Sequence, residues 1–346
     1  MRVATISEYG DLSVFNYQEG FKIPIVKTNQ ILVEIKATSI NPIDLMKREG
    51  YGKAVFEKQR SSKFPWILGS DVSGIVKKVG SKVKKFQEGQ EIWGCISEAS
   101  RGTYAEYAIL YENEIEEKPK NLSFVEAASI PYVGLSTWSA LIRWAGLRPN
   151  DLFNKEVFIQ AGAGGVGTFA IQLLNYWGAR ITTTCSEKNN KLLLRLGAKK
   201  TIDYNKEDFD KHLSDLDISL DLVGNLGDPG SVLKTINILK KSSSSHYITL
   251  NHPFLKIIDN KGFLLGIPSA LFERQKMKRI HSPINIHWSI FRPSISGLQE
   301  ITRLVEESKI KPIIDSIFSL EDIVEAQKKV ATSHAVGKVV VKVSDD

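Results

Sequence analysis

The segment VFIQAGAGGVGTFAIQLL, residues 157–174, decides the fold class. In it Gly162, Gly164 and Gly167 match the G-x-G-x-x-G pattern, between an apolar run typical of a strand and a stretch with helical spacing. In such units the first glycine makes a tight turn, the second lets the backbone approach a pyrophosphate, and the third lets the helix pack on the strand. N–H groups at the start of the helix then face the phosphates. The segment therefore predicts a dinucleotide site in a parallel α/β domain.

The end of the following strand indicates which dinucleotide is bound. An NAD site carries an acidic residue there, about 20 residues after the first glycine, which binds the ribose 2′-hydroxyl. In this chain Cys185 takes that position, and Ser186 and Lys188 follow it with a hydroxyl and a positive charge suited to a 2′-phosphate. The pattern favours NADPH. Glu187 argues the other way, because a rotated loop would bring its carboxylate to the ribose.

The amino-acid composition excludes several other classes of protein. A chain of 346 residues with 42% apolar content predicts two globular domains. The apolar stretch at 263–272 is about half the roughly 20 residues that a membrane-spanning helix requires. The net charge of +7 comes without a basic run interleaved with aromatics, so we expect no nucleic-acid binding. Two distant cysteines, Cys95 and Cys185, predict neither a disulfide framework nor a structural zinc site, and indicate a reducing compartment.

The order of expected elements divides the chain. Up to about residue 122, short strands separated by frequent turn signals predict an all-β, barrel-like unit, with strands at 31–40, 72–80, 90–96 and 103–110. From 123 to 290, strands alternate with helices, the first helix at 124–142, and this predicts a parallel sheet. The tail 291–346 reads as two amphipathic helices and a strand that return to the first domain, the second helix beginning with Ser319 as N-cap.

Several longer segments carry a family resemblance. They are ATSINPIDLMKREGYG at 37–52, LGSDVSGIVKKVGSKVKKFQEGQEIWG at 68–94, GTYAEYAI at 102–109, AASIPYVGLSTWSAL at 127–141 and the glycine segment itself. Their order and spacing resemble the medium-chain dehydrogenase/reductase superfamily, and within it the zinc-independent quinone oxidoreductase branch with its mitochondrial members. The resemblance implies a GroES-like substrate domain at 1–122, completed by 291–346, and a Rossmann domain at 123–290. It also implies that the cofactor lies between the two domains.

The residues at the zinc positions of metal-dependent relatives point to a metal-free enzyme. Those relatives carry a cysteine and a His-Glu pair where this chain has Asn41, Ser70 and Asp71. A catalytic zinc ion needs three nitrogen, sulfur or oxygen ligands from the protein. We therefore expect no metal, and direct hydride transfer from NADPH to a quinone-type acceptor, linked by the resemblance to ubiquinone metabolism in mitochondria.

Two residues are candidates for contact with the acceptor. In related enzymes the position of Asn41 places an amide near the nicotinamide and the acceptor; alternatively Asn41 simply forms the turn before Pro42. Tyr51, in the segment REGYG, either donates a proton, stacks on a ring or is an exposed loop aromatic.

The resemblance also implies a set of cofactor contacts. They comprise the phosphate loop, the 2′-phosphate site, the adenosine end, the nicotinamide end and a C-terminal motif in which Val336 replaces the family's arginine; the residues are Gly162, Ala163, Gly164, Gly165, Val166, Gly167, Ser186, Lys188, Tyr204, Gly224, Leu250, Asn251, His334, Ala335, Gly337 and Lys338. His252, beside Asn251, is the histidine closest to this site. The other histidines are scattered along the sequence without metal-ligand spacing.

Two alternatives to the hypothesis of a quinone reductase remain open. A 2-enoyl thioester reductase would use the same architecture with Tyr51 as the acid. A protein of another class would hold NADPH as a structural ligand and act through a membrane-associated partner. The resemblance is compatible with a homodimer. It favours mitochondria, whereas the first residues read as a strand without a presequence pattern, so a cytoplasmic location is the alternative.

Overall fold

The computed structural model describes residues 1–59, 63–96, 102–223 and 229–345, and the chain folds as two compact units. The first unit comprises Met1–Leu135 together with Pro293–Asp346, and the second comprises Ser136–Arg292. The domain limits predicted from the sequence are 122 and 290, and the boundaries of these units lie at residues 135–136 and 292–293. The boundary at residues 135–136 falls inside helix α4 (Pro131–Trp138), which begins in the first unit and ends in the second.

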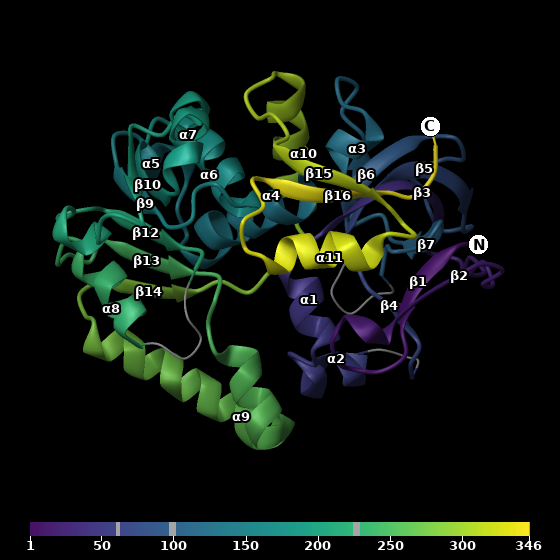
Figure 1. Ribbon diagram of the computed structural model, residues 1–346, viewed down its shortest axis with the longest axis horizontal. Helices are drawn as coiled ribbons and strands as arrows, with labels where there is room; N and C mark the ends of the chain where they lie inside the picture. The colour runs from purple at the N-terminus through teal and green to yellow at the C-terminus, as the bar shows by residue number, and fades with distance from the viewer. Residues whose placement is uncertain (60–62, 97–101, 224–228, 346) are drawn as a thin grey trace. The chain divides into compact units, whose positions relative to one another are not determined.

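The second unit is built on a six-stranded sheet in the order β11-β10-β9-β12-β13-β14 (Figure 1). All neighbouring strands are parallel, as the alternation of strands and helices predicts. The order reverses on either side of β9, which makes this the Rossmann arrangement and confirms the predicted α/β class. The strands are β9 (Glu156–Ile159), β10 (Arg180–Cys185), β11 (Lys200–Asp203), β12 (Ile218–Asp221), β13 (His246–Thr249) and β14 (Asn285–Trp288).

The helices differ from the sequence expectation at two places, one at the boundary between the units and one within the second unit. The helix expected at 124–142 is three pieces, α3 (Phe124–Ala127), α4 and a π-helical segment at Ser139–Trp144, because Pro131 lacks an N–H group and starts a new helix. A long helix, α9, was not predicted. The helices that follow the boundary are α5 (Pro149–Leu152), α6 (Gly165–Tyr176), α7 (Asn190–Leu196), α8 (Pro229–Asn237) and α9 (Phe254–Ile280).

The first unit contains a seven-stranded sheet and a three-stranded sheet. The large sheet runs β15-β16-β3-β5-β6-β8, with β7 also paired to β3, and the small one runs β2-β1-β4. The strands are β1 (Val3–Ile6), β2 (Phe15–Gln18), β3 (Ile31–Ile40), β4 (Trp66–Ile67), β5 (Asp71–Val79), β6 (Glu91–Cys95), β7 (Tyr107–Leu110), β8 (Ile115–Glu117), β15 (Ile314–Ser319) and β16 (Lys338–Lys342), with helices α1 (Pro42–Arg48), α2 (Lys53–Gln59), α3, α10 (Ile295–Glu306) and α11 (Ile323–Ala331).

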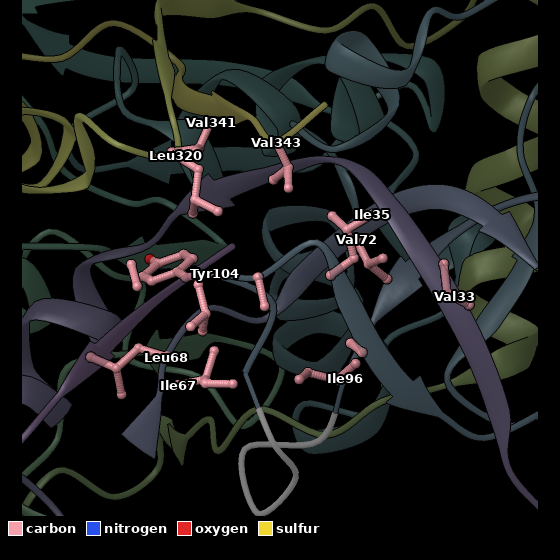
Figure 2. Close-up of a cluster of buried hydrophobic side chains, with 14 of the residues drawn as sticks. Val33, Ile35, Ile67, Leu68, Val72, Ile96, Tyr104, Leu320, Val341 and Val343 are labelled. Atoms are coloured by element: carbon pink, nitrogen blue, oxygen red, sulfur yellow. The ribbon is translucent and has the colours of Figure 1, made fainter. Parts of the chain in front are cut away.

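The core of the first unit joins both ends of the chain (Figure 2). Val33 and Ile35 of β3 are fully buried in the same cluster as Val341 of β16 and Leu320. Strand β16 pairs antiparallel with β3, with Val339 opposite Ile40, and parallel with β15. The tail is therefore part of the first unit's sheet and core.

The start of the last helix corrects one expectation. Ser319 is the final residue of β15 rather than an N-cap, and α11 begins only at Ile323 after Asp322. The Ser319 hydroxyl still accepts a hydrogen bond from the Asp322 N–H group at 3.3 Å. The Ser319 side chain therefore makes the hydrogen bond expected of a cap, but this bond stabilises the turn at 319–322 that precedes α11.

Candidate active site

The glycine segment forms the turn between β9 and α6. Gly164 is the N-cap of α6 and has no side chain to accept from the N–H groups of the first turn. The turn is held from β10: the Ala161 N–H donates to the Thr184 hydroxyl at 2.9 Å, and the Gly162 N–H donates to the Thr184 carbonyl at 2.9 Å. Residues 163–166 are partly exposed. The start of a twelve-residue helix thus presents its N–H groups and positive dipole end to a ligand.

The three motif glycines are required for different reasons. A Cβ on Gly162 would lie 2.1 Å from the Thr183 hydroxyl, and one on Gly167 would lie 2.5 Å from the Ala161 carbonyl, so the fold itself excludes side chains there. A Cβ on Gly164 would meet only the Ala161 carbonyl, at an ordinary 3.5 Å. The protein's own packing leaves space at Gly164, which fits a backbone that a pyrophosphate approaches closely.

The end of β10 lies beside this turn, as the sequence predicts. Cys185 is its last residue, and burial raises the pKa of this thiol to about 11. Ser186 is half-buried and accepts from the Asn189 amide at 3.2 Å, while Lys188 is exposed. The Glu187 carboxylate forms an exposed ion pair with the Lys206 ammonium at 2.5 Å. Tyr204, which follows β11, is 51% exposed.

The carboxyl ends of β12 and β13 carry the next group of expected contacts. The Leu250 N–H donates to the Asp221 carbonyl at 3.3 Å, and the Asn251 amide donates to the Leu222 carbonyl at 2.8 Å. Gly224 lies outside the described residues. These ends share one edge of the sheet with the ends of β9 and β10, because all these strands are parallel. Ligands of such sheets bind at this edge, beside the strand where the order reverses.

His252 lies at the same edge and is almost completely buried. Its ring stacks on Trp288 at a centroid distance of 5.5 Å, and Nε2 is 3.1 Å from the Ser289 carbonyl. Nε2 therefore carries the hydrogen, and Nδ1 is buried without a hydrogen-bond partner among the described residues. Burial lowers the pKa of His252 to about 4.

This burial predicts a loss of stability in mild acid. The unfolded chain takes up a proton on His252 below pH 6.5, whereas the folded chain does so only near pH 4, so the free energy of unfolding should fall across that interval. At pH 5 the loss attributable to this residue is about 2 kcal/mol. Denaturant unfolding at pH 7 and pH 5 measures it. The His252→Phe variant should show a smaller decrease than the wild type; an unchanged decrease in that variant, equal to that of the exposed His212→Gln control, would contradict the assignment.

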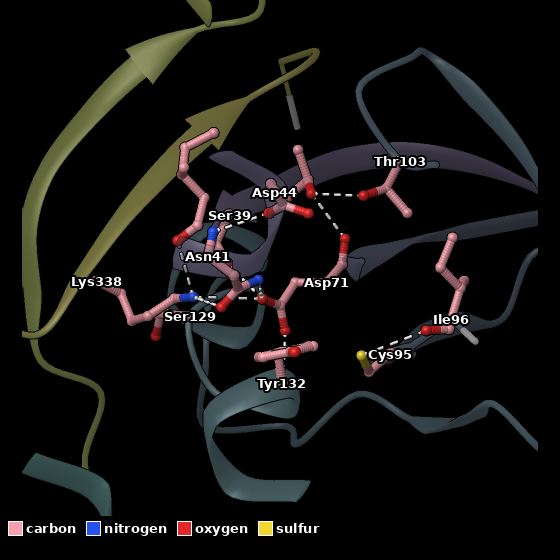
Figure 3. Close-up of polar contacts among 12 residues, drawn as sticks. Ser39, Asn41, Asp44, Asp71, Cys95, Ile96, Thr103, Ser129, Tyr132 and Lys338 are labelled. Atoms are coloured by element: carbon pink, nitrogen blue, oxygen red, sulfur yellow. Dashed lines mark hydrogen bonds and ion pairs between the residues drawn. The ribbon is translucent and has the colours of Figure 1, made fainter. Parts of the chain in front are cut away.

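In the first unit, Asp71 is the centre of a buried polar network (Figure 3). Its Oδ2 accepts from the Ser39 hydroxyl at 2.5 Å and from the Asn41 amide at 2.8 Å, and its Oδ1 accepts from the Tyr132 N–H at 2.6 Å. The Lys338 ammonium lies 3.5 Å from Oδ2. A buried carboxylate is tolerated only with such compensation.

Lys338 and Asn41 complete this network. The Lys338 ammonium donates to the Ile40 carbonyl at 3.1 Å and to the Asn41 Oδ1. The Asn41 amide is thereby fixed, with its oxygen on Lys338 and one of its two amide hydrogens on Asp71. Asn41 is also the N-cap of α1 ahead of Pro42, so it takes the turn role, and among the described residues only Asp71 accepts from its amide group, which has two hydrogens.

A second carboxylate, Asp44, stabilises the start of α1. Its Oδ2 accepts from the Asn41 N–H at 2.9 Å and from the Tyr104 hydroxyl at 2.9 Å. Complete burial raises the pKa of Asp44 and also that of Tyr104. These bonds hold Asn41 from its backbone, while Asp71 and Lys338 hold its side chain.

The other expected site residues of this unit are spread more widely. Tyr51 is half-buried in the turn between α1 and α2, flanked by Gly50 and Gly52 at positive φ. His334 is exposed and Ala335 is half-buried in the loop before β16. Gly337 has φ +76° and faces the Ile313 carbonyl, where a Cβ would lie at 2.1 Å. Lys338 has its three N–H groups directed to protein acceptors, so a cofactor contact there would come from the main chain.

The histidines are less scattered in space than in sequence. His246 of β13 and His287 of β14 stack, with Nδ1 and Nε2 of the two rings 3.1 Å apart. Burial lowers the pKa of both. Among the residues that the structure describes, no group of three or more His, Cys, Asp or Glu side chains is arranged to hold a metal ion. Both cysteines are buried, and neither forms a disulfide.

Sequence reasoning missed Asp71 as the centre of the network and Ser39 as one of its donors. Asp71 was noticed only as a residue at a zinc position. The signal available was a carboxylate at the first position of a strand that is otherwise buried, which requires a cation from elsewhere in the chain.

A Rossmann glycine turn and a GroES-like unit with an anchored amide together define a dinucleotide-dependent oxidoreductase. Residues 27–120 match the alcohol dehydrogenase GroES-like domain, and residues 196–341 match the zinc-binding dehydrogenase family. The chain belongs to the medium-chain dehydrogenase/reductase superfamily.

Individual relatives extend over nearly the whole chain. The protein named "NAD(P)H oxidoreductase RTN4IP1, mitochondrial" from Danio rerio is 36% identical over 99% of this chain and 91% of its own length, and the Homo sapiens protein of that name is 35% identical over 98% and 88%. The solved quinone oxidoreductase from Coxiella burnetii superposes with a TM-score of 0.82 at 30% identity, covering 99% of both chains.

Proposed function

We propose that this chain is an NADPH-dependent oxidoreductase that reduces a quinone-type acceptor by direct hydride transfer, and that it acts in mitochondria. The observation that carries the cofactor choice is the end of β10, where Cys185 stands in place of a carboxylate and Ser186 and Lys188 follow. The C. burnetii quinone oxidoreductase and the relatives named mitochondrial support the acceptor class and the location. A bound NADPH supplies the hydride.

The chain's own residues contribute binding and orientation. The turn at 162–167 would hold the pyrophosphate, Ser186 and Lys188 the 2′-phosphate, and the ends of β12 and β13 the nicotinamide end. Asn41, held by Asp71 and Lys338, would donate its remaining amide hydrogen to an acceptor oxygen as negative charge develops there. The binding role of each residue is part of the proposal.

The test is oxidation of NADPH and of NADH, measured side by side with short-chain quinones as acceptors. We expect NADPH to be preferred and quinone to be reduced. Preference for NADH would contradict the assignment of Ser186 and Lys188. Thermal stabilisation by NADPH, without turnover of any quinone or enone, would instead support the alternative of a protein that only binds the dinucleotide.

The cofactor preference should depend on one lysine. The Lys188→Glu variant should lose about tenfold to hundredfold in kcat/KM for NADPH, because a charge-assisted hydrogen bond to phosphate contributes about 1.5–3 kcal/mol. Its kcat/KM for NADH should change little. Lys191→Glu, on an exposed lysine of α7, is the matched control. An equal loss with both cofactors, or an equal loss in the control, would contradict a 2′-phosphate contact.

Reduction of an enone carbon–carbon double bond is the second candidate. The protein named 2-methylene-furan-3-one reductase from Solanum lycopersicum is 31% identical over 99% of this chain and 79% of its own length. Such a reaction adds a hydride and a proton, so it requires a positioned acid, and half-buried Tyr51 between two glycines at positive φ is the candidate.

A single variant separates the two reactions. If Tyr51 is the acid, Tyr51→Phe should lower kcat for an enone or an enoyl thioester at least about a hundredfold. Quinone reduction should persist. Tyr107→Phe, on a half-buried tyrosine of β7, is the control. Equal enone turnover by the wild type and Tyr51→Phe would remove Tyr51 from the proton-donor role.

A further inference from the structure

Helix α9 exposes a row of large apolar side chains. Leu264, Leu265, Leu271 and Phe272 are 86%, 70%, 49% and 66% exposed. Their spacing of one and seven residues places all four on the same side of a helix. Isolated exposed apolar residues need no explanation, but a contiguous row indicates a binding surface.

The opposite side of α9 shows why this row is not the side that packs on the unit. The helix is interrupted at Gly262, where φ is +73°, and continues from Phe263. Gly266 and Ala270 are buried, and a Cβ on Gly266 would lie 2.5 Å from the Ile258 Cα. Gly266 therefore lies at the contact between the two sections of α9, Ala270 is buried on the same side, and the large apolar residues face away from that side.

The charges around the row are predominantly positive. Lys261 lies before it, and Lys276 and Arg279 continue the same exposed side after it. Over its full length α9 carries six basic side chains and two acidic ones, Asp259 and Glu273. The Glu273 carboxylate lies 3.9 Å from the Lys276 ammonium, which is a long ion pair. An apolar row between basic residues matches the interface of an anionic bilayer, where apolar side chains enter the acyl boundary and lysines and arginines meet the headgroups.

We propose that the exposed side of α9 docks the second unit on the surface of a membrane that contains anionic phospholipids. The helix lies on this surface and does not cross it, since no helix among the described residues is long and apolar enough to span a bilayer. The occupant follows from the charge: a purely apolar partner would offer no anionic groups to the exposed Lys276 and Arg279 beside the row, whereas anionic headgroups would. Within its own unit α9 contacts β14.

The experiment is co-sedimentation of the full chain with vesicles of phosphatidylcholine alone or with about 30 mol% phosphatidylserine. The wild type should pellet with the anionic vesicles, and the binding should weaken at high salt. Leu271→Ser/Phe272→Ser should lower the partition coefficient at least about tenfold. Lys276→Gln/Arg279→Gln should lower it about fivefold for each charge removed.

Phe153→Ser is the matched control, since Phe153 is a 65% exposed phenylalanine of the same unit and directly follows α5, which Figure 1 shows well away from α9. It should bind like the wild type, and all variants should keep the wild-type unfolding temperature because the changed residues are on the surface. Binding of the apolar variant at the wild-type level would overturn the proposal. So would a wild type that stays in solution with anionic vesicles but sediments in the ultracentrifuge as a dimer that the apolar variant dissociates, because α9 would then contact a second copy.

Discussion

Lys338→Met should destabilise the first unit by about 3–5 kcal/mol, the usual cost of leaving a buried carboxylate without its cation. Asp71 is fully buried, and Lys338 is the ammonium that faces it, 5% exposed. Methionine fills a similar volume, so the loss reports the charge rather than a cavity. Denaturant unfolding, followed by tryptophan fluorescence, measures the change.

Two further variants make this result specific. Lys328→Met removes a lysine from an exposed pair with Glu325, at 2.6 Å, and should cost less than about 1 kcal/mol. The double variant Lys338→Met/Asp71→Asn should recover part of the loss, because neither charge then remains buried alone. A double variant less stable than the sum of the two single changes would contradict the assigned pairing.

Gly167→Ala should mainly lower the stability of the fold, whereas Gly164→Ala should mainly weaken NADPH binding. At Gly167 the new Cβ would lie 2.5–2.7 Å from backbone atoms of Ala161 and Gly162, which cannot move aside, so we expect about 1–3 kcal/mol of destabilisation. At Gly164 the nearest atom is at 3.5 Å and φ is −73°, so the fold should persist with the small loss of an N-cap glycine.

NADPH binding distinguishes the two. Gly164→Ala should bind NADPH about fivefold to hundredfold more weakly while keeping nearly the wild-type unfolding temperature, because its methyl group occupies the approach of the pyrophosphate. Titration of NADPH fluorescence measures the affinity. Wild-type affinity in a folded Gly164→Ala variant would mean that the turn does not contact the pyrophosphate.

The second unit's strands could be predicted from sequence because the signals for β9 to β13 are local: apolar runs separated by turns and helical spacing. Two of its elements could not. Strand β14 directly follows α9, and because that helix is not expected from the sequence, the alternation of helices and strands gives no signal for β14. Helix α9 contains Gly262 and Pro268, both unfavourable to helices, and its large apolar residues are on the exposed side.

The network around Asp71 could not be predicted for another reason. Its carboxylate and its ammonium are separated by 267 positions in the sequence, and they meet only because β16 pairs with β3. The same holds for the contact of His246 with His287, on neighbouring strands. The periodicity of a short segment does not indicate contacts between residues that are distant in the sequence. The glycine turn, in contrast, is determined by six consecutive residues, 162–167.

The position of β16 in the first sheet has a consequence for synthesis. The second unit is one continuous segment, Ser136–Arg292, so it can fold as soon as it leaves the ribosome. The first unit must wait for strands β15 and β16, which are made last. At about 5–20 residues per second, the 267 positions between Asp71 and Lys338 take roughly 13–53 s, during which β3 and Asp71 lack the strand and the cation that complete them. During that interval the nascent first unit has an open edge on β3 where β16 will pair, and Asp71 has not yet met the ammonium of Lys338.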